Sequence, residues 1–264
     1  MSNVLNTTLD RDDLFKPRYT QIIGSLEDLM RKLRKLGLEY SNYWGSFGEL
    51  GGLEWSNRGG NNYEPYPNAF DDRRIPWFKY WEISHLVLNS GILDNKGCKC
   101  LDLGGCSSIF SYLLASMGYR VHVIDINEKL VENGNSVAKA MGWNIHNYKL
   151  DIAELNQIKT HFDYIFSLCV FEHLPMSSRF EGINQVKRLL KPNGVFAITF
   201  DYLNPNPNAK IDSEESVEEQ FIKPSGMSLM GSPFRDNGKR YLSHLEKSYT
   251  FGALFLRKAR GVVG

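Results

Sequence analysis

The sequence predicts a doubly wound α/β fold, and two observations support this prediction. Five short apolar runs follow one another between about residues 97 and 201, and stretches with helical periodicity separate them. Short apolar runs are typical of strands buried on both faces, and the alternation predicts right-handed strand–helix–strand units with a mostly parallel sheet. The predicted strands are residues 99–103, 120–125, 145–150, 162–167 and 194–200.

Three helices fit between these strands, at residues 108–117, 127–141 and 178–190. Ser107 or Ser108 can cap the first helix, and Gly142 follows the second as its C′ residue. Pro192-Asn193-Gly194 predicts a turn into the fifth strand. Beyond the turn-rich break after Asp201, we expect a short acidic helix at 213–221 and an antiparallel last strand at 249–258.

The first 96 residues differ in character from the rest. They hold four of the five tryptophans and a Gly- and Asn-rich stretch, residues 45–68. Residues 22–36 have the apolar spacing of an amphipathic helix, and 75–93 contain another. We therefore expect an N-terminal helical cap and substrate-binding region (1–96) over a core (97–264) with a substrate-side insertion at about 202–248.

Composition narrows the class of protein. Hydrophobic residues make up 42% of the chain and charged residues 23%, which are globular values, and the net charge is +1. A net charge this small does not indicate a nucleic-acid partner. No apolar run is long enough to predict a membrane-spanning helix. Cys98-x-Cys100 without a histidine cluster is a poor zinc pattern, so we expect no metal and reduced thiols in a cytoplasmic protein.

The loops after the strands carry the chemistry, because ligands of open α/β sheets bind beyond the carboxyl ends of the strands. After the first strand, Gly104 and Gly105 let the backbone turn tightly and approach a ligand. Asp125, at the end of the second strand, is placed to accept hydrogen bonds from both hydroxyls of a ribose. Asp151 ends the third strand, where it could accept an exocyclic amine, while Ile152 covers a ring face.

Five motifs in this order resemble the class I S-adenosylmethionine-dependent methyltransferases of the small-molecule type. The likeness covers residues 97–201 and a last strand near 249–258. The motifs are Leu101-Asp102-Leu103-Gly104, Val123-Ile124-Asp125, Leu150-Asp151, the stretch 162–174 with Glu172-His173, and 189–194. The resemblance implies a Rossmann-like sheet and S-adenosyl-L-methionine as the cofactor, with S-adenosyl-L-homocysteine as its product.

The resemblance also implies which residues hold the cofactor. Gly104 and the neighbouring amides of Gly105 and Cys106 would bind the methionine portion, and Leu168 and Cys169 would flank it through their main chain. Asp125 would bind the ribose with Ile126 beside the adenine, and Asp151 with Ile152 would hold the adenine amine. We also assign Asp102 to this site. The family's loop is Asp-x-Gly-x-Gly-x-Gly, and here Cys106 and Ser108 replace its second and third glycines.

His173 is the best-placed candidate for a catalytic base, because it follows the fourth strand and an imidazole can accept a hydroxyl proton. A packing role at a helix start is the alternative. Asp201 either points at the acceptor or is a turn residue, and His85 and His244 are expected to be structural. Within the aromatic segment 77–82, Tyr80 or Trp81 is the candidate for closing over the cofactor, although core packing is the alternative.

The predicted function is methyl transfer to a small molecule or sugar, on oxygen. Methylation of nucleic acid or protein is one alternative, but no Asn-Pro-Pro-Tyr-like motif follows the fourth strand. A nicotinamide enzyme would carry Gly-x-Gly-x-x-Gly, which is absent. The altered glycine loop leaves a non-catalytic cofactor-binding relative as a further alternative. We expect a small-molecule or glycan acceptor and allow for a homodimer.

Overall fold

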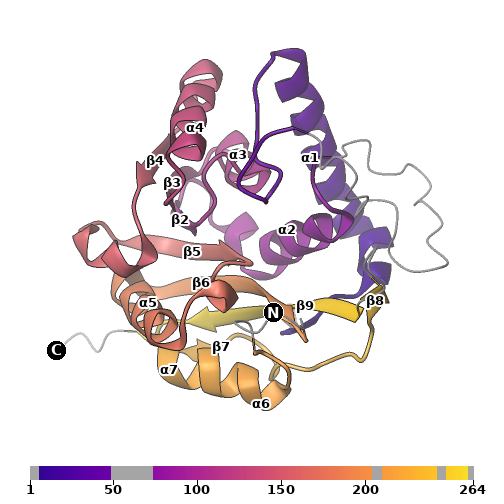
Figure 1. The fold of residues 1–264 in the computed structure, drawn as a ribbon, viewed down its shortest axis with the longest axis vertical. Coiled ribbons are helices and arrows are strands. Elements are labelled where there is room, and N and C mark those ends of the chain that lie inside the picture. The colour runs from indigo at the N-terminus through magenta and orange to yellow at the C-terminus, as the bar shows by residue number, and fades with distance from the viewer. Residues whose placement is uncertain (1–5, 49–73, 204–209, 243–247, 261–264) are drawn as a thin grey trace.

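A computed structural model describes residues 6–48, 74–203, 210–242 and 248–260. They form a nine-stranded sheet (Figure 1). Seven of its strands follow the order β1-β9-β6-β5-β2-β3-β4, and the other two, β7 and β8, pair with β9. The strands are β1 (Thr7–Thr8), β2 (Lys99–Leu103), β3 (Arg120–Asp125), β4 (Ile145–Lys149), β5 (Phe162–Leu168), β6 (Leu190–Tyr202), β7 (Ser228–Leu229), β8 (Tyr241–Leu242) and β9 (Ser248–Arg257).

The five central strands, β2 to β6, run parallel, and β9 lies antiparallel to β6. The prediction of a mostly parallel, doubly wound sheet with an antiparallel last strand is therefore confirmed. The chain passes from β2 outward to β3 and β4, and then returns to place β5 on the other side of β2. This reversal of strand order lies beside β2, so the carboxyl ends of β2 and β5 flank the position where such folds bind ligands.

Helices cover both faces of the sheet (Figure 1). The α-helices are α1 (Pro17–Lys35), α2 (Trp77–Asn89), α3 (Ile109–Ser116), α4 (Glu128–Met141), α5 (Met176–Leu189), α6 (Glu214–Val217) and α7 (Lys223–Ser225). The other helical segments are η1 (Arg11–Phe15), η2 (Ile92–Asp94), η3 (Ile152–Gln157), η4 (Phe171–His173) and η5 (Glu218–Ile222).

Two apolar clusters follow from this layering. One joins α1 to α4 with one face of the sheet, and the other joins α5, η3 and η5 with the opposite face. Strand β1 pairs with β9 at Thr7 and Thr8, so the N-terminal segment extends the sheet. Helix α2 contacts β6 and β9, and α1 contacts both α2 and α3. Helices α1 and α2 therefore share the core of the sheet.

The local signals for the helix ends act as the sequence indicates. Ser108 is the N-cap of α3, where its hydroxyl accepts a hydrogen bond from the Ser111 amide, and Gly142 ends α4 with a φ of 65°. Around Pro192 the structure differs from a simple turn. Strand β6 already begins at Leu190, and the predicted turn lies within a shift of register between β5 and β6, with Asn193 at a φ of 62°.

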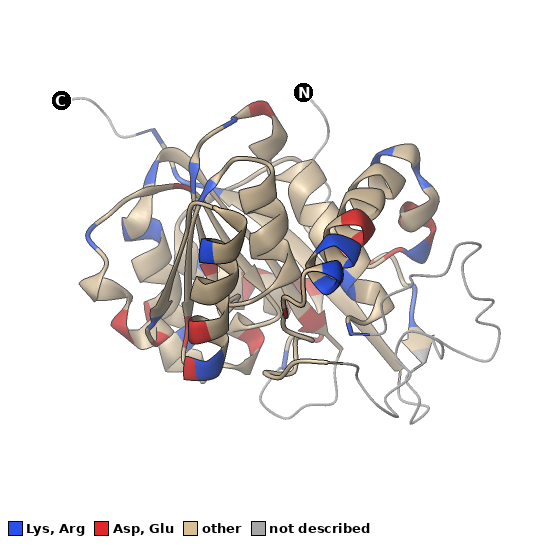
Figure 2. Ribbon diagram, turned by 90° about the horizontal axis from the view of Figure 1, so that it is seen from above, with Lys and Arg blue, Asp and Glu red and all other residues tan. Residues whose placement is uncertain are grey.

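In the view of Figure 2, acidic and basic residues are interspersed along the ribbon and do not form one basic stripe. No helix among the described residues combines the length and the apolar character needed to cross a membrane.

Candidate functional site

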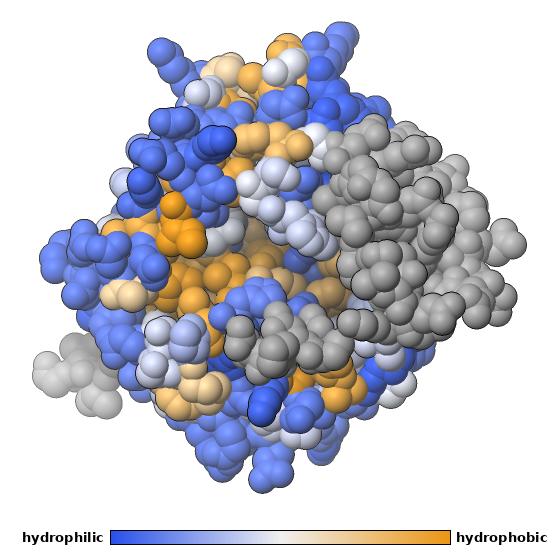
Figure 3. Space-filling model, in the orientation of Figure 1, coloured by the Kyte–Doolittle hydropathy of each residue, from blue (hydrophilic) through white to orange (hydrophobic). Residues whose placement is uncertain are grey.

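A cavity of about 870 Å³ opens at the carboxyl ends of the parallel strands. Figure 3 shows it as a hollow on this face, with apolar side chains in its depth. Its walls come from the loops after β2, β3, β4 and β5 and from the end of β6. Ser41, residues 43–45, α2 and the start of β9 complete them. Of the predicted site residues, these line the cavity: Gly104, Cys106, Asp125, Ile126, Asp151, Ile152, Leu168, Cys169 and His173.

The loop after β2 explains why two glycines stand together. Gly104 has a φ of 77°, and a side chain there would meet the Val170 side chain at 2.8 Å. At Gly105 a Cβ atom would lie only 1.9 Å from the Asp102 carboxylate. Gly104 therefore presents bare backbone to the cavity, and Gly105 makes room for Asp102 behind it.

Asp102 lies beneath this loop and outside the cavity lining. Its Oδ2 atom accepts hydrogen bonds from the hydroxyls of Ser108, at 3.3 Å, and Ser111, at 2.7 Å. Burial raises the pKa of Asp102 to about 7. Its Oδ1 atom is buried and has no hydrogen-bond partner among the described residues. Asp102 thus fixes the start of α3 to the glycine loop, and its direct cofactor role stays a prediction.

A serine hydroxyl holds the loop between the two positions where the family pattern has glycine. Ser107 adopts a φ of 60°, although it carries a side chain, and its hydroxyl donates to the Leu130 carbonyl at 2.6 Å. The Asn133 amide donates in turn to the Ser107 hydroxyl at 2.9 Å. These bonds stabilise a backbone conformation that only glycine adopts without cost. Ser107 thus holds the turn between Cys106 and Ser108, the two residues that replace glycine.

The loops after β3 and β4 form a half-polar, half-apolar wall. Asp125 is 9% exposed, and its Oδ1 accepts a hydrogen bond from the Asn127 amide at 2.9 Å. Burial raises the pKa of this carboxyl. Asp151 caps η3 by accepting from the Ala153 amide at 2.8 Å, while Ile126, at 69% exposure, extends beside it. This wall offers two carboxylates and an apolar surface to a planar, hydroxylated ligand.

A segment far away in the sequence crosses the same loops. The Ser41 amide donates to the Ser107 carbonyl at 2.8 Å, and Asn133 donates to the Glu39 carbonyl at 3.0 Å. The Asn127 side chain donates to the Gly45 carbonyl at 3.1 Å. Residues 41 and 43–45 line the cavity as a result. No sequence motif singles them out as site residues, although Ser41-Asn42 and Gly45 are the residue types that favour such a turn.

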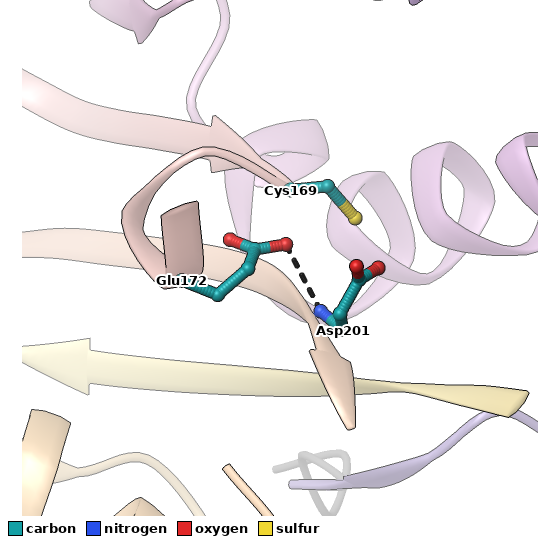
Figure 4. A group of neighbouring side chains, drawn as sticks. All are labelled: Cys169, Glu172 and Asp201. Atoms are coloured by element: carbon teal, nitrogen blue, oxygen red, sulfur yellow. Dashed lines mark hydrogen bonds between the residues drawn. The ribbon is translucent and has the colours of Figure 1, made fainter. Parts of the chain in front are cut away.

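The other end of the cavity gathers polar groups from β5, η4 and β6 (Figure 4). The Cys169 Sγ and one carboxylate oxygen each from Glu172 and Asp201 lie within 4.8 Å of one another. The Asp201 amide donates to Glu172 Oε1 at 2.9 Å, and His173 Nε2 lies 3.9 Å from the same oxygen. Cys169 has a φ of 52°, an uncommon conformation for a residue other than glycine and one often found at functional sites.

Burial governs the charges at this end. Together with the neighbouring Asp201, it raises the pKa of Glu172 to about 8, so Glu172 is mostly protonated at neutral pH. Burial also raises the pKa of the Cys169 thiol well above its usual value. Cys169 donates to Glu82, which is paired with Lys79.

Helix α2 presents Lys79 to the cavity and turns Tyr80 and Trp81 away from it. The Tyr80 hydroxyl donates to Glu27 of α1, and the Trp81 indole donates to Asp13 at 2.9 Å. Both rings are fully buried outside the cavity lining. His85 is likewise buried, with its Nδ1 2.6 Å from the Tyr19 hydroxyl, whereas His244 lies outside the described residues.

Comparison with known proteins identifies the family. A family model described as a methyltransferase domain matches residues 94–244, more than half of the chain. The chain belongs to this family. Its resemblance to the class I S-adenosylmethionine-dependent methyltransferases is thereby confirmed.

Two relatives are named ubiquinone biosynthesis O-methyltransferase. The one from Paramagnetospirillum magneticum is 34% identical over 130 residues, which are 49% of this chain and 51% of the relative. The one from Coxiella burnetii is 28% identical over 146 residues, covering 50% of this chain and 61% of the relative. The chain thus spans little more than half the length of these relatives.

Solved structures share the fold at low sequence identity. TehB from Haemophilus influenzae is 23% identical, with a TM-score of 0.53 over 65% of this chain and 61% of TehB. The [4+2]-cyclase SpnF reaches a TM-score of 0.56 at 13% identity, over 78% of this chain and 87% of SpnF. Since SpnF is named as a cyclase, the fold by itself does not fix the reaction, and the site must decide it.

Proposed function

We propose that this protein binds S-adenosylmethionine and transfers its methyl group to an oxygen atom of a small molecule. The observation that supports this most is that one cavity joins two ends with different linings. One end has carboxylates and apolar walls at the strand ends, at Asp125 and Asp151. The other has His173, Asp201 and aromatic side chains. A cofactor and an acceptor need such adjacent, open sites.

The residues present fit the cofactor. The bare backbone of Gly104 suits the methionine portion, because a Cβ atom would fill the space now taken by Val170. Asp125 has one carboxylate oxygen bonded to the Asn127 amide and can accept ribose hydroxyls with the other. Leu130, Leu150, Ile126 and Ile152 supply apolar walls for a base. Leu168 and Cys169 adjoin this pocket through their main chain.

The chemistry asks little of the protein. When bound, S-adenosylmethionine supplies a methyl group on a positively charged sulfur. The protein has to place the acceptor oxygen in line and receive its proton. We assign the proton to His173, whose side chain lines the cavity and is 47% exposed, so the proton can pass on to water. The protonated Glu172 beside it leaves the imidazole free to act as the base.

The acceptor is proposed from the walls around this end. Tyr43, Trp44, Phe78, Tyr249 and Phe251 all line it, and such rings pack against flat or ring-shaped molecules. The names of the relatives support methylation on oxygen. A sugar ring of a glycan is the second candidate, since aromatic walls also stack on sugars. A cytoplasmic location and a homodimer stay predictions.

Product analysis tests the proposed function. The full chain is incubated with S-adenosylmethionine and a panel of phenols and sugars, and methylated products are sought by mass spectrometry. We expect methyl ethers, with S-adenosylhomocysteine released in equal amount. Methylation on nitrogen or carbon alone, or S-adenosylmethionine bound but never consumed with any acceptor, would contradict this proposal.

The role of His173 has its own test. His173→Ala should lower turnover about a hundredfold while S-adenosylhomocysteine binds as tightly as to the wild type. His161→Ala, a change of the same residue type outside the cavity lining, serves as the matched control. Full turnover of the His173→Ala variant at every pH would exclude His173 as the base.

A further inference from the structure

Helix α2 carries a buried ion pair at the wall of the cavity. Lys79 Nζ lies 3.0 Å from Glu82 Oε1, and the two side chains are 5% and 0% exposed. Pairs of this kind contribute little net stability, because removing two charges from water costs about as much as their attraction returns. Stability therefore does not explain why two charges lie in an otherwise apolar helix.

The carboxylate of the pair is held from several sides. Glu82 Oε2 accepts hydrogen bonds from the Thr199 hydroxyl at 2.5 Å and from the Cys169 thiol at 3.1 Å, in addition to Lys79 at 3.2 Å. Glu82 does not line the cavity, whereas Lys79 does. Glu82 thus anchors the ammonium from behind and fixes its position.

The ammonium faces three aromatic rings on its other side. Its nitrogen lies 5.0 Å from the Tyr43 ring centre, 5.8 Å from that of Phe78 and 5.9 Å from that of Phe251. Burial opposes its charge, but Cys169 and Glu82 beside it more than offset this effect, and the pKa of Lys79 lies above its usual value. Lys79 is therefore a fixed cation at neutral pH. An ammonium has three donors, so Lys79 can still donate into the cavity.

Tyr43 adds a second donor. Its hydroxyl is buried and donates to none of the described residues, while the Phe110 amide lies against its oxygen. Its backbone has a φ of 68°, an unfavourable conformation that is stabilised by the hydrogen bond from the Tyr43 amide to the Ser41 hydroxyl at 3.1 Å. The ring of this strained residue faces the ammonium, and its hydroxyl keeps an unused donor, which is typical of a preorganised binding site.

We propose that Lys79, assisted by Tyr43, binds the reacting oxygen of the acceptor as an oxyanion, which makes a phenol or enol the preferred class of acceptor. This inference rests on the proposed function. The hydroxyl proton leaves to His173, the oxygen forms its bond to the methyl carbon, and the carbon–sulfur bond breaks with its electron pair returning to sulfur. The neutral ether that results is held less strongly by the ammonium, which favours product release.

A chromogenic phenol tests the proposal independently of methyl transfer. The full chain is saturated with S-adenosylhomocysteine and mixed with 4-nitrophenol, and the visible absorption of the phenolate is titrated against pH. A cation in contact with an oxyanion lowers its pKa by about one unit or more. We expect that shift in the wild type, its loss in Lys79→Met and its retention in Lys79→Arg.

Two further variants keep the test decisive. Lys79→Met leaves Glu82 buried without its partner and can unfold the chain, so the double variant Lys79→Met/Glu82→Gln removes both charges together. It should fold, bind S-adenosylhomocysteine as the wild type does, and show no shift. Tyr43→Phe should show a reduced shift. The other titratable groups on this wall, Cys169, Asp201 and His173, stay unchanged in all variants.

The outcomes separate this proposal from the proposed function. An unshifted 4-nitrophenol pKa in the wild type, or a full shift in the double variant, overturns the role of Lys79. Displacement of 4-nitrophenol by 4-nitrobenzoate at lower concentration than by unlabelled phenols also overturns it, in favour of a carboxylate ligand. Absence of S-adenosylhomocysteine binding contradicts the proposed function, whatever the probe does.

Discussion

The two ends of the cavity differ in how the chain builds them. At the cofactor end, Gly104, Asp125 and Asp151 follow three successive strands, so about fifty residues of continuous sequence supply that wall. At the acceptor end, Tyr43, Lys79, His173, Asp201 and Phe251 come from five separate segments spread over most of the chain. The first end depends on local strand–loop geometry, and the second depends on how distant segments pack together.

This difference has a physical consequence. A change in a strand-end loop alters a rigid turn, and its effect should appear in cofactor affinity. A change at the acceptor end alters one side chain of an assembled wall, and its effect should appear in acceptor binding or turnover. Variants at the two ends of the cavity test this separation.

The largest effect is expected at Gly105. Gly105→Ala would place a Cβ atom 1.9 Å from the Asp102 carboxylate, so the loop has to move. We expect cofactor binding to be lost and the free energy of unfolding to fall by about 3 kcal/mol. Gly24→Ala, on α1 with nothing within 4 Å, is the matched control and should be neutral or slightly stabilising. Urea unfolding and calorimetry measure both, and a stable, cofactor-binding Gly105→Ala variant would sink this explanation of the loop.

Asp125→Ala should weaken S-adenosylmethionine binding at least tenfold, about 1.4 kcal/mol, because the ribose hydroxyls lose their acceptor. The shift of bound 4-nitrophenol should be unchanged, since Asp125 lies at the other end of the cavity. Calorimetry and the optical titration together check both halves of this statement. An Asp125→Ala protein with wild-type cofactor affinity would remove Asp125 from the site.

Asp102 predicts a dependence of stability on pH. Its pKa is raised to about 7 by burial, so the folded state keeps a proton that the unfolded chain releases near pH 4. The free energy of unfolding should therefore fall as the pH rises from about 4 to about 7, by up to about 1.4 kcal/mol per unit. Asp102→Asn should flatten this slope in urea titrations at pH 5 and pH 6. Equal slopes in both proteins would show that Asp102 is ionised in the folded state.

The smallest effect is expected at Asp151, which is exposed and caps η3. Asp151→Asn should weaken cofactor binding only about threefold, roughly 0.6 kcal/mol, because an amide oxygen can still cap the turn and water reaches the site. Calorimetry against Asp151→Ala separates the two contributions. A loss as large as that of Asp125→Ala would reverse the ranking of the two acids.

The contrast also explains what could be read from the sequence. The strands, the antiparallel last strand and the glycine loop are encoded by local patterns, and the structure places Gly104, Asp125 and Asp151 where those patterns put them. Helix α2 shows the limit. Nearly all of its residues are buried, so periodicity does not tell which face meets the cavity. The aromatic pattern therefore indicates Tyr80 or Trp81 and does not indicate Lys79. A lysine and a glutamate three residues apart in so apolar a helix were the available signal.

The position of the segment around residue 43 could not be predicted from the sequence, for a different reason. Its place over the cofactor loops depends on single hydrogen bonds, such as that from the Ser41 amide to Ser107, between segments more than sixty residues apart. No local pattern encodes such a contact. The rest of the Gly- and Asn-rich stretch, residues 49–68, lies outside the described residues.

The central claim is that the wall built by Gly104, Asp125 and Asp151 binds S-adenosylmethionine. Calorimetric titration of the wild-type chain with S-adenosylmethionine, S-adenosylhomocysteine and NAD tests it most directly. We predict saturable binding of the first two at one site per chain and no binding of NAD. Absence of heat and of competition with both adenosyl compounds, or tighter binding of NAD, would contradict the account.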